Sequence, residues 1–181
     1  MRALVATLGL VMVLGLTGCS GPADEPVDPA PTGPPGPATV APEQQFTLDD
    51  TAEFDDGLTV QIAGRVADIA ADSARGAEST QGRIVVATVL IENGTADAYD
   101  PTATLVTATY ADGRTAEPVT DPSNEIGTGF GGEVAPGDEG VSVVGFAVPT
   151  DQLKRVTITV DLNDEGHEPV SFAGEVERAE S

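Results

Sequence analysis

The feature that most constrains this chain is the strict alternation of apolar and polar residues in the segment RVTITVDL, residues 155–162. Its apolar side chains occupy every second position, and threonine or aspartate lies between them. Because successive side chains of a strand point to opposite faces, this pattern predicts a β-strand with one face in a core and one toward solvent. Such a strand must pair with others and cover its apolar face.

Similar segments, rich in valine, isoleucine and threonine, recur from Phe46 onward with turn residues between them. We expect strands at 58–62, 66–69, 83–93, 102–110, 141–149 and 155–162, and a last strand that carries Val170, Phe172 and Val176 on one face. The segment 83–93 is apolar at nearly every position, which predicts a central strand covered on both faces. Turn pairs such as Asn93-Gly94 separate the segments.

No segment of this region has convincing helical periodicity. The pattern predicts an all-β fold, an immunoglobulin-like antiparallel β-sandwich of about seven strands. The single cysteine and the lack of tryptophan distinguish it from antibody domains and exclude an intramolecular disulfide.

The N-terminus has the pattern of an export signal. Arg2 provides a positive charge and residues 3–16 form an apolar stretch, which is too short to span a bilayer comfortably. Leu16-Thr17-Gly18-Cys19 then resembles the bacterial lipoprotein lipobox, in which the cysteine is acylated and becomes the mature N-terminus. We therefore expect Cys19 to be the lipidation site, since a catalytic thiolate would need a base and a defined pocket.

A proline-rich segment, residues 21–42, follows Cys19 and contains eight of the 14 prolines. Proline lacks the backbone N–H and fixes φ, so this segment predicts an extended spacer. The expected organisation is a signal peptide at 1–18, the lipidated cysteine and linker at 19–45, and the β-sandwich domain at 46–181.

Three stretches resemble a known domain family. GRIVVATVLIENGT (82–95), and later VAPGDEGVSVVGFAVP with LKRVTITV, are similar to a telokin-like family of unknown function carried on many bacterial lipoproteins. Asn93, Pro136-Gly137, Phe146 and Pro149 match its turn and core positions. The resemblance implies an immunoglobulin-like sandwich, similar to that of a small secreted mycobacterial antigen, in a cell-envelope setting. It implies no catalytic residues.

The charge narrows the range of partners. The chain carries 30 acidic residues against 8 basic ones, a formal net charge of -22. This charge argues against binding to nucleic acid and to anionic lipid headgroups, so that attachment to a membrane must be hydrophobic or covalent. Aromatic residues make up only 4% of the chain, which leaves sugar or base stacking unsupported.

Two motifs suggest ligand sites. GTGFGG (127–132) satisfies a dinucleotide-binding pattern, but that pattern needs a preceding strand and a following helix, and we interpret the segment as a loop. DLNDEG (161–166) matches the first half of a calcium loop through Asp161, Asn163 and Glu165. The twelfth position is Phe172, which cannot coordinate calcium, so a hairpin turn is favoured.

Three further features are weaker. His167 is the only histidine, so no multi-histidine metal site or catalytic triad can be assembled. Asn93-Gly94-Thr95 fits a glycosylation sequon that has little weight beside a bacterial signal. The acidic residues between 49 and 56 favour a solvated face over a cation site, and they are Asp49, Asp50, Glu53, Asp55 and Asp56.

The leading hypothesis is a lipid-anchored protein on the extracytoplasmic face of the cell membrane. Cys19 and the spacer would tether a β-sandwich that interacts with a protein or cell-wall partner. The alternative is an extracytoplasmic small-ligand or calcium-binding module, with Asp161, Asn163 and Glu165 as its best candidates. Catalysis is the least favoured class, and no cofactor is expected.

Overall fold

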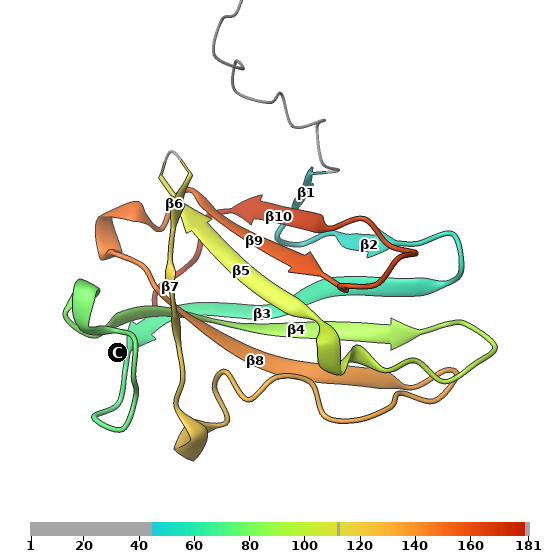
Figure 1. The fold of residues 1–181 in the computed structure, drawn as a ribbon. Helices are drawn as coiled ribbons and strands as arrows, with labels where there is room; N and C mark the ends of the chain where they lie inside the picture. The colour runs from blue at the N-terminus through green and yellow to red at the C-terminus, as the bar shows by residue number, and fades with distance from the viewer. Residues whose placement is uncertain (1–44, 112, 180–181) are drawn as a thin grey trace, which may run out of the picture. The chain divides into compact units, whose positions relative to one another are not determined.

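Two five-stranded sheets form the domain in the computed structural model, which describes residues 45–111 and 113–179 (Figure 1). The first sheet contains, in spatial order, β1 (Gln45–Thr47), β10 (Val170–Gly174), β9 (Val156–Asp161), β5 (Leu105–Tyr110) and β6 (Arg114–Thr115). The second contains β2 (Thr51–Glu53), β3 (Leu58–Ile69), β4 (Arg83–Asn93), β8 (Glu139–Ala147) and β7 (Glu117–Val119). Four short 3₁₀ turns lie in the connections: η1 (Glu78–Thr80), η2 (Pro101–Ala103), η3 (Pro122–Asn124) and η4 (Thr150–Gln152).

The all-β sandwich is confirmed, with ten strands rather than about seven. The additional strands are short edge strands of two or three residues, which are too short to produce a periodic pattern. The sandwich is antiparallel, as predicted, except at one edge, where β1 pairs in parallel with β10 and brings Phe46 opposite Phe172.

Several predicted strand boundaries also shift, and two of the shifts have a clear structural cause. Residues 58–62 and 66–69 belong to one strand, β3, because a bulge between Ile62 and Gly64 re-aligns the strand with β4 instead of ending it. β5 begins at Leu105 rather than at residue 102. The preceding residues form η2, which starts at Pro101 and is capped by the Asp100 side chain, an acceptor from the Thr102 amide at 3.0 Å.

β4 occupies the predicted central position, between β3 and β8. Its inward residues, such as Val85 and Val89, are completely buried. Its outward residues, including Val86 and Leu90, are only half-buried. The prediction of a strand covered on both faces is therefore wrong, because the described domain has two layers and no third layer covers this sheet.

The core fills the space between the two sheets. Phe172 of β10 is fully buried, and its ring centroid lies 5.6 Å from that of Phe46. Around it pack the inward side chains of both sheets, among them Val60, Val85, Val89, Ile91, Val156, Ile158 and Val160. Because each strand contributes alternate residues, the period-two pattern of the sequence becomes one continuous apolar layer.

The chain changes sheets several times. It passes from β4 to β5, from β6 to β7 and from β8 to β9, and each of these connections leaves one sheet for the other. The β6–β7 crossing is short, and its residue Ala116 is 4% exposed. Next to the short edge strands β6 and β7, β5 of the first sheet lies opposite β8 of the second sheet (Figure 1).

Replacing the central aromatic residue tests this description of the core. We expect Phe172→Ala to lower the free energy of unfolding by about 3–5 kcal/mol, because it removes a fully buried ring and leaves a cavity. Leu105→Ala is the matched control, since Leu105 is 55% exposed, and it should change stability by no more than about 0.5 kcal/mol. Urea unfolding measures both, and equal effects of the two substitutions would contradict the assigned core.

Candidate binding cleft and polar junction

The glycine-rich segment 127–132 is a loop between η3 and β8, as the sequence analysis favoured. No helix follows it, since β8 is the next element in the described chain. Its one large side chain, Phe130, is only 8% exposed and packs against the core. The Phe130 side chain therefore anchors the loop to the sandwich, and the loop lies beside β5 and β8.

Two glycines of β8 allow this close approach. A Cβ at Gly140 would lie 2.9 Å from a methyl carbon of Val134, and a Cβ at Gly145 would lie 2.7 Å from a methyl carbon of Ile126. Both separations are shorter than normal carbon contacts. Ile126 and Val134, which flank the loop, therefore pack closely over these two positions, and a side chain at either one would force their methyl groups to shift.

Asp121 holds the segment that leads into this loop. Its carboxylate, 1% exposed as a residue, accepts hydrogen bonds from the Asn124 amide group at 2.7 Å and from the Ser73 hydroxyl at 2.9 Å. It also accepts from the Ser123 backbone amide at 3.2 Å. The hydrogen bond from Asn124, supported by those from Ser73 and the local amides, holds the pKa of Asp121 below its ordinary value in spite of burial.

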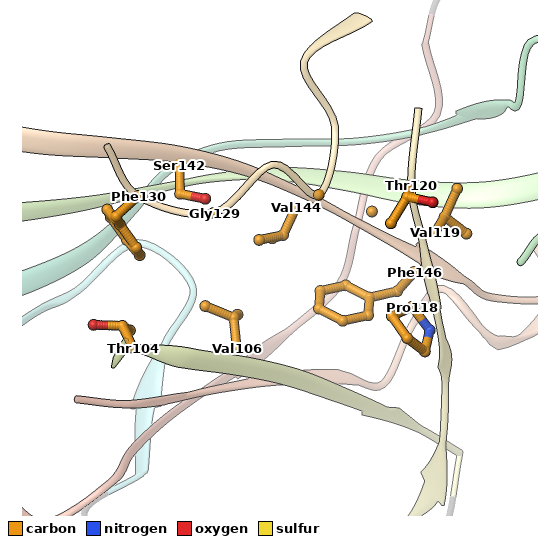
Figure 2. Close-up of a pocket in the computed structure, with 12 residues that line it drawn as sticks. Thr104, Val106, Pro118, Val119, Thr120, Gly129, Phe130, Ser142, Val144 and Phe146 are labelled. Atoms are coloured by element: carbon orange, nitrogen blue, oxygen red, sulfur yellow. The ribbon is translucent and has the colours of Figure 1, made fainter. Parts of the chain in front are cut away.

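A cleft of about 170 Å³ lies between β5 and β8 beside this loop (Figure 2); we call it the edge cleft. Val106 comes from β5, Val144 and Phe146 come from β8, Pro118 comes from β7, and Phe130 comes from the loop. Thr104 and Ser142 lie near Phe130 at one end, and Pro118 and Phe146 lie toward the other (Figure 2). The edge cleft thus has apolar walls and a polar end.

The two hydroxyl groups at the polar end are buried without a hydrogen bond. Ser142 is 3% exposed, and neither its Oγ nor Thr104 Oγ1 has a partner in the described chain. Burial and then the charge of Asp164 raise the pKa of the nearby Tyr99 phenol, and the Thr104 side chain beside it lowers this pKa in part. A buried hydroxyl without a partner costs about 1–3 kcal/mol. The sequence gives no signal of this site, because its lining residues are ordinary strand residues.

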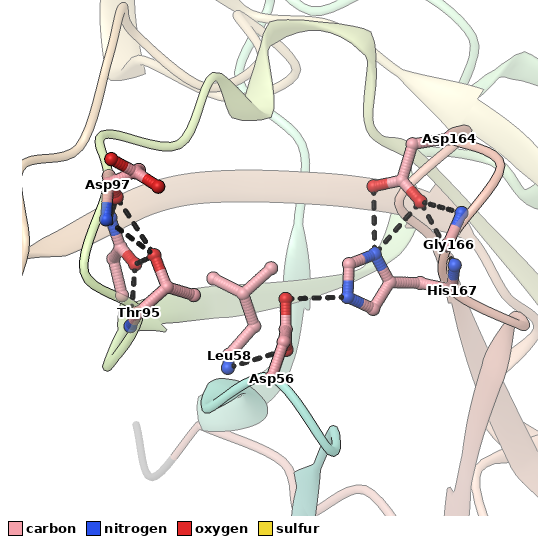
Figure 3. A network of polar contacts seen from close by, with 8 residues as sticks. Asp56, Leu58, Thr95, Asp97, Asp164, Gly166 and His167 are labelled. Atoms are coloured by element: carbon pink, nitrogen blue, oxygen red, sulfur yellow. Dashed lines mark hydrogen bonds and ion pairs between the residues drawn. The ribbon is translucent and has the colours of Figure 1, made fainter. Parts of the chain in front are cut away.

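A second polar group joins the loops at one end of the sandwich. His167, between β9 and β10, has its Nδ1 2.8 Å from Asp164 Oδ1 and its Nε2 3.1 Å from Asp56 Oδ2 (Figure 3). Its ring also packs edge-on against Phe54, with centroids 4.6 Å apart. Asp56 precedes β3 of the other sheet, so this histidine junction links the two sheets.

The histidine junction also uses part of the predicted calcium loop. Asp161 accepts the Asn163 amide at 2.8 Å, and Asp164 accepts the amides of Gly166 and His167 at 2.9 and 3.0 Å. These are side-chain to backbone bonds that form a tight turn. Residues 162–166 therefore lie in the favoured β9–β10 turn, which follows Asp161 at the end of β9. Within residues 45–111 and 113–179, no group of three or more histidine, cysteine, aspartate or glutamate side chains is arranged to hold a metal ion.

The acidic residues near the N-terminal end of the domain have separate partners. Asp49 forms an ion pair of 2.7 Å with Arg65, Asp50 accepts the Thr47 amide at 2.8 Å, and Asp56 contacts His167. The expectation of a solvated face fits Asp49, whose side chain is 79% exposed.

Asn93 of the sequon has a structural role. It is fully buried, and its Nδ2 donates to the carbonyl groups of Asp97 and Val134, both at 2.8 Å. Its Oδ1 accepts from the amide and the hydroxyl of Thr95. Glycosylation requires an exposed side-chain amide, whereas this one ties two loops together.

Cys19, the predicted lipidation site, lies outside the described residues, as do the signal peptide and most of the linker. In the part of the chain that the structure describes, no helix has the length and apolar character needed to cross a membrane.

Several solved structures are similar to this domain at low sequence identity. The yjhA protein from Bacillus subtilis matches with a TM-score of 0.55 and 12% identity, over 72% of this chain and 99% of that one. MPT63, a secreted protein from Mycobacterium tuberculosis, matches with a TM-score of 0.49 and 14% identity, over 74% and 98% of the two chains. The ycdA protein from Bacillus subtilis matches with a TM-score of 0.49 and 14% identity, over 71% of this chain and 38% of that one.

At this identity, the similarity to yjhA supports a shared fold and nothing further. No family model and no curated protein matches the chain. The immunoglobulin-like sandwich that the sequence resemblance implies is the fold observed.

The histidine junction predicts an acid-dependent loss of stability. Burial alone would raise the pKa of Asp164. Hydrogen bonds from the His167 ring and from the Gly166 and His167 amides, together with the electrostatic effect of His167, instead hold this pKa below the usual 3.8. A carboxyl group with a depressed pKa stabilises the fold above its unfolded pKa, and this contribution disappears as the pH falls through the folded pKa. We expect Asp164→Asn to lower Tm at neutral pH and to flatten the fall of Tm below about pH 4.

Glu168→Gln, at an exposed position of the same turn, is the control and should leave both the neutral Tm and the acid slope unchanged. Calorimetry across the acid range measures the slopes. An unchanged slope in Asp164→Asn would contradict a stabilising role for the histidine junction.

Proposed function

We propose that this protein is a lipid-anchored binding module of the cell envelope. Leu16-Thr17-Gly18-Cys19 supplies the acylation site, residues 21–42 supply the spacer, and the β-sandwich supplies the binding surface on the extracytoplasmic side. Two or three acyl chains on Cys19 would hold the protein at the membrane, since a single chain binds only marginally.

The observation that carries the binding role is the edge cleft. Buried polar groups in folded proteins are nearly always hydrogen-bonded, and an exception calls for an explanation. Ser142 Oγ is such an exception, and Ser142 lines a cleft whose walls are mostly apolar. Pockets of this composition, with a few convergent polar groups, are typical of ligand sites.

A role in binding is favoured over catalysis by the surroundings of the one histidine. Both ring nitrogens of His167 lie within hydrogen-bond distance of carboxylates, and its ring packs against Phe54. A carboxylate only accepts hydrogen bonds, so the two contacts coexist as hydrogen bonds only when both ring nitrogens carry protons. Because both ring nitrogens of His167 are engaged by carboxylates, the histidine is better suited to linking two loops than to accepting a proton from a substrate.

The partner is a protein or a component of the cell wall. With a formal net charge of -22, the chain attracts cationic surfaces and repels nucleic acid and anionic lipid headgroups. The edge cleft gives some weight to the small-ligand alternative, because an isolated small molecule with one polar group would also fit it. No specific observation favours calcium.

The calcium alternative has a direct test. Because the carboxylates of the β9–β10 turn accept hydrogen bonds from their own backbone amides, we expect no change in Tm when calcium is added to millimolar concentration. Differential scanning calorimetry with and without a chelator measures this. A calcium-dependent rise in Tm that Asp161→Asn abolishes would revive the calcium site.

Acylation has its own test in cells. We expect Cys19→Ala to abolish incorporation of a fatty-acid label and to move the protein out of the membrane fraction, since the thiol is the attachment atom. Ser20→Ala, at the neighbouring position, should retain both label and location. Labelling that persists in Cys19→Ala would overturn the proposed anchor.

A further inference from the structure

One side of β5 has no strand partner along half its length. β9 pairs with the whole of β5 on one side, whereas β6 pairs on the other side only with Thr109 and Tyr110. The Ala116 amide then donates to the Ala108 carbonyl before the chain leaves for the second sheet. Residues 105–107 are therefore left as an open edge in the described domain, and an open edge is a template for an added strand.

The backbone groups of Val106 face this open side. In an antiparallel pair, residues whose N–H and C=O point to a given neighbour alternate along the strand. Because the Ala108 carbonyl accepts from Ala116 on this side, the N–H and C=O of Val106 point the same way. The residue that would face Val106 on the continued line of β6 is Pro118, but Pro118 has joined the other sheet opposite Phe146.

The side chain of an added residue opposite Val106 would enter the edge cleft. Directly opposite residues of paired strands carry their side chains on the same face of the sheet. Val106 points into the edge cleft, toward Val144 and Phe146 of the opposite sheet (Figure 2). The open edge and the cleft are thus two parts of one site, the first for a backbone and the second for a side chain.

The size and polarity of the edge cleft select that side chain. Its volume is about 170 Å³, and an apolar protein cavity of about 150 Å³ holds a benzene molecule. An aromatic ring therefore fits between the apolar walls. The unbonded hydroxyl of Ser142 at one end favours a polar atom on the ligand, which phenylalanine lacks and tyrosine has.

The net charge of the chain indicates which residues should flank the side chain that enters the edge cleft. Glu117 and Glu125 lie next to the elements that border the edge cleft, but so do Arg75 and Arg114, and the net negative charge comes from the whole chain, whose formal charge is -22. A partner that approaches this edge gains from positive charge and loses from negative charge.

We propose that a basic, extended segment of another protein adds to β5 as an antiparallel strand and places a tyrosine side chain in the edge cleft. The main-chain hydrogen bonds to Val106 supply affinity, and the phenol, bound between Val106 and Val144 with its hydroxyl at Ser142, supplies specificity. This inference names the partner class for the binding role proposed above, and it depends on that role.

The binding test uses the full acylated chain in detergent and a fluorescently labelled peptide, Lys-Thr-Tyr-Thr-Lys, followed by anisotropy. The three central residues of the peptide match the open edge at 105–107, and its terminal lysines extend beyond that edge because Ala116 already pairs with Ala108. We expect the tyrosine peptide to bind about tenfold more tightly than its Tyr→Phe form, as for the loss of one buried hydrogen bond, and binding to be lost in its Tyr→Ser form. Methylation of the tyrosine backbone nitrogen should abolish binding, because that N–H faces Val106. Methylation of either threonine nitrogen, which faces away, should not.

Two serine variants separate a ligand role from a structural one. We expect Ser142→Ala to raise Tm, because it removes a buried hydroxyl without a partner, and to weaken the tyrosine peptide to the affinity of the phenylalanine peptide. Ser171→Ala is the matched control: Ser171 is 4% exposed, and its hydroxyl is hydrogen-bonded to Thr159 at 2.8 Å. It should lower Tm and leave peptide binding unchanged.

Equal affinities of the tyrosine and phenylalanine peptides, equal effects of the two kinds of N-methylation, or no binding at all would each overturn this inference. A photo-crosslinking amino acid placed at position 105 in cells shows whether only the tyrosine-segment inference fails or the proposed binding function fails as well. A crosslinked partner without peptide binding rejects only the tyrosine segment. No crosslink and no peptide binding together reject the binding role as well.

Discussion

The rest of the structure depends on the interlocking of two apolar sheet faces. Each strand contributes every second side chain to one layer, and fully buried residues such as Val89, Val156 and Phe172 close that layer from both sides. Because this core is the main contact between the sheets, the loops at either end are free to carry other chemistry. The histidine junction, in which Asp56 and His167 come from opposite sheets, adds a polar link at one of these ends.

The edge cleft follows from the way the chain changes sheets. At Ala116 the backbone leaves β6 and enters β7, so the strand that would have completed the edge of β5 completes the edge of β8 instead. Pro118 favours this change of sheet, because it has no N–H and could not donate a hydrogen bond to β5 if it stayed opposite Val106. The glycine-rich loop then closes the gap only in part, with Phe130 as its anchor. What remains is an opening with a backbone edge and a side-chain pocket.

The contrast among the buried polar groups sharpens this interpretation. Asn93 and Asp121 are as inaccessible as the core, and both have several hydrogen-bond partners that hold neighbouring loops. Ser142 is equally inaccessible and has none in the described chain. An unbonded hydroxyl is unfavourable in the free protein, and a cost of this kind is expected where a ligand supplies the missing partner.

The sequence by itself determined the all-β class, the main strands and the turn at residues 163–166, because alternation and turn residues depend only on near neighbours in the chain. It also predicts the acylated Cys19, which lies outside the described residues. Only the tertiary structure decided the short edge strands, the parallel pairing of β1, and the juxtaposition of Val106 with Ser142. These features depend on which segments, far apart in the chain, meet in the folded sandwich. The partner of a strand of two or three residues cannot be predicted from the residues of that strand, because so short a segment has no periodic pattern.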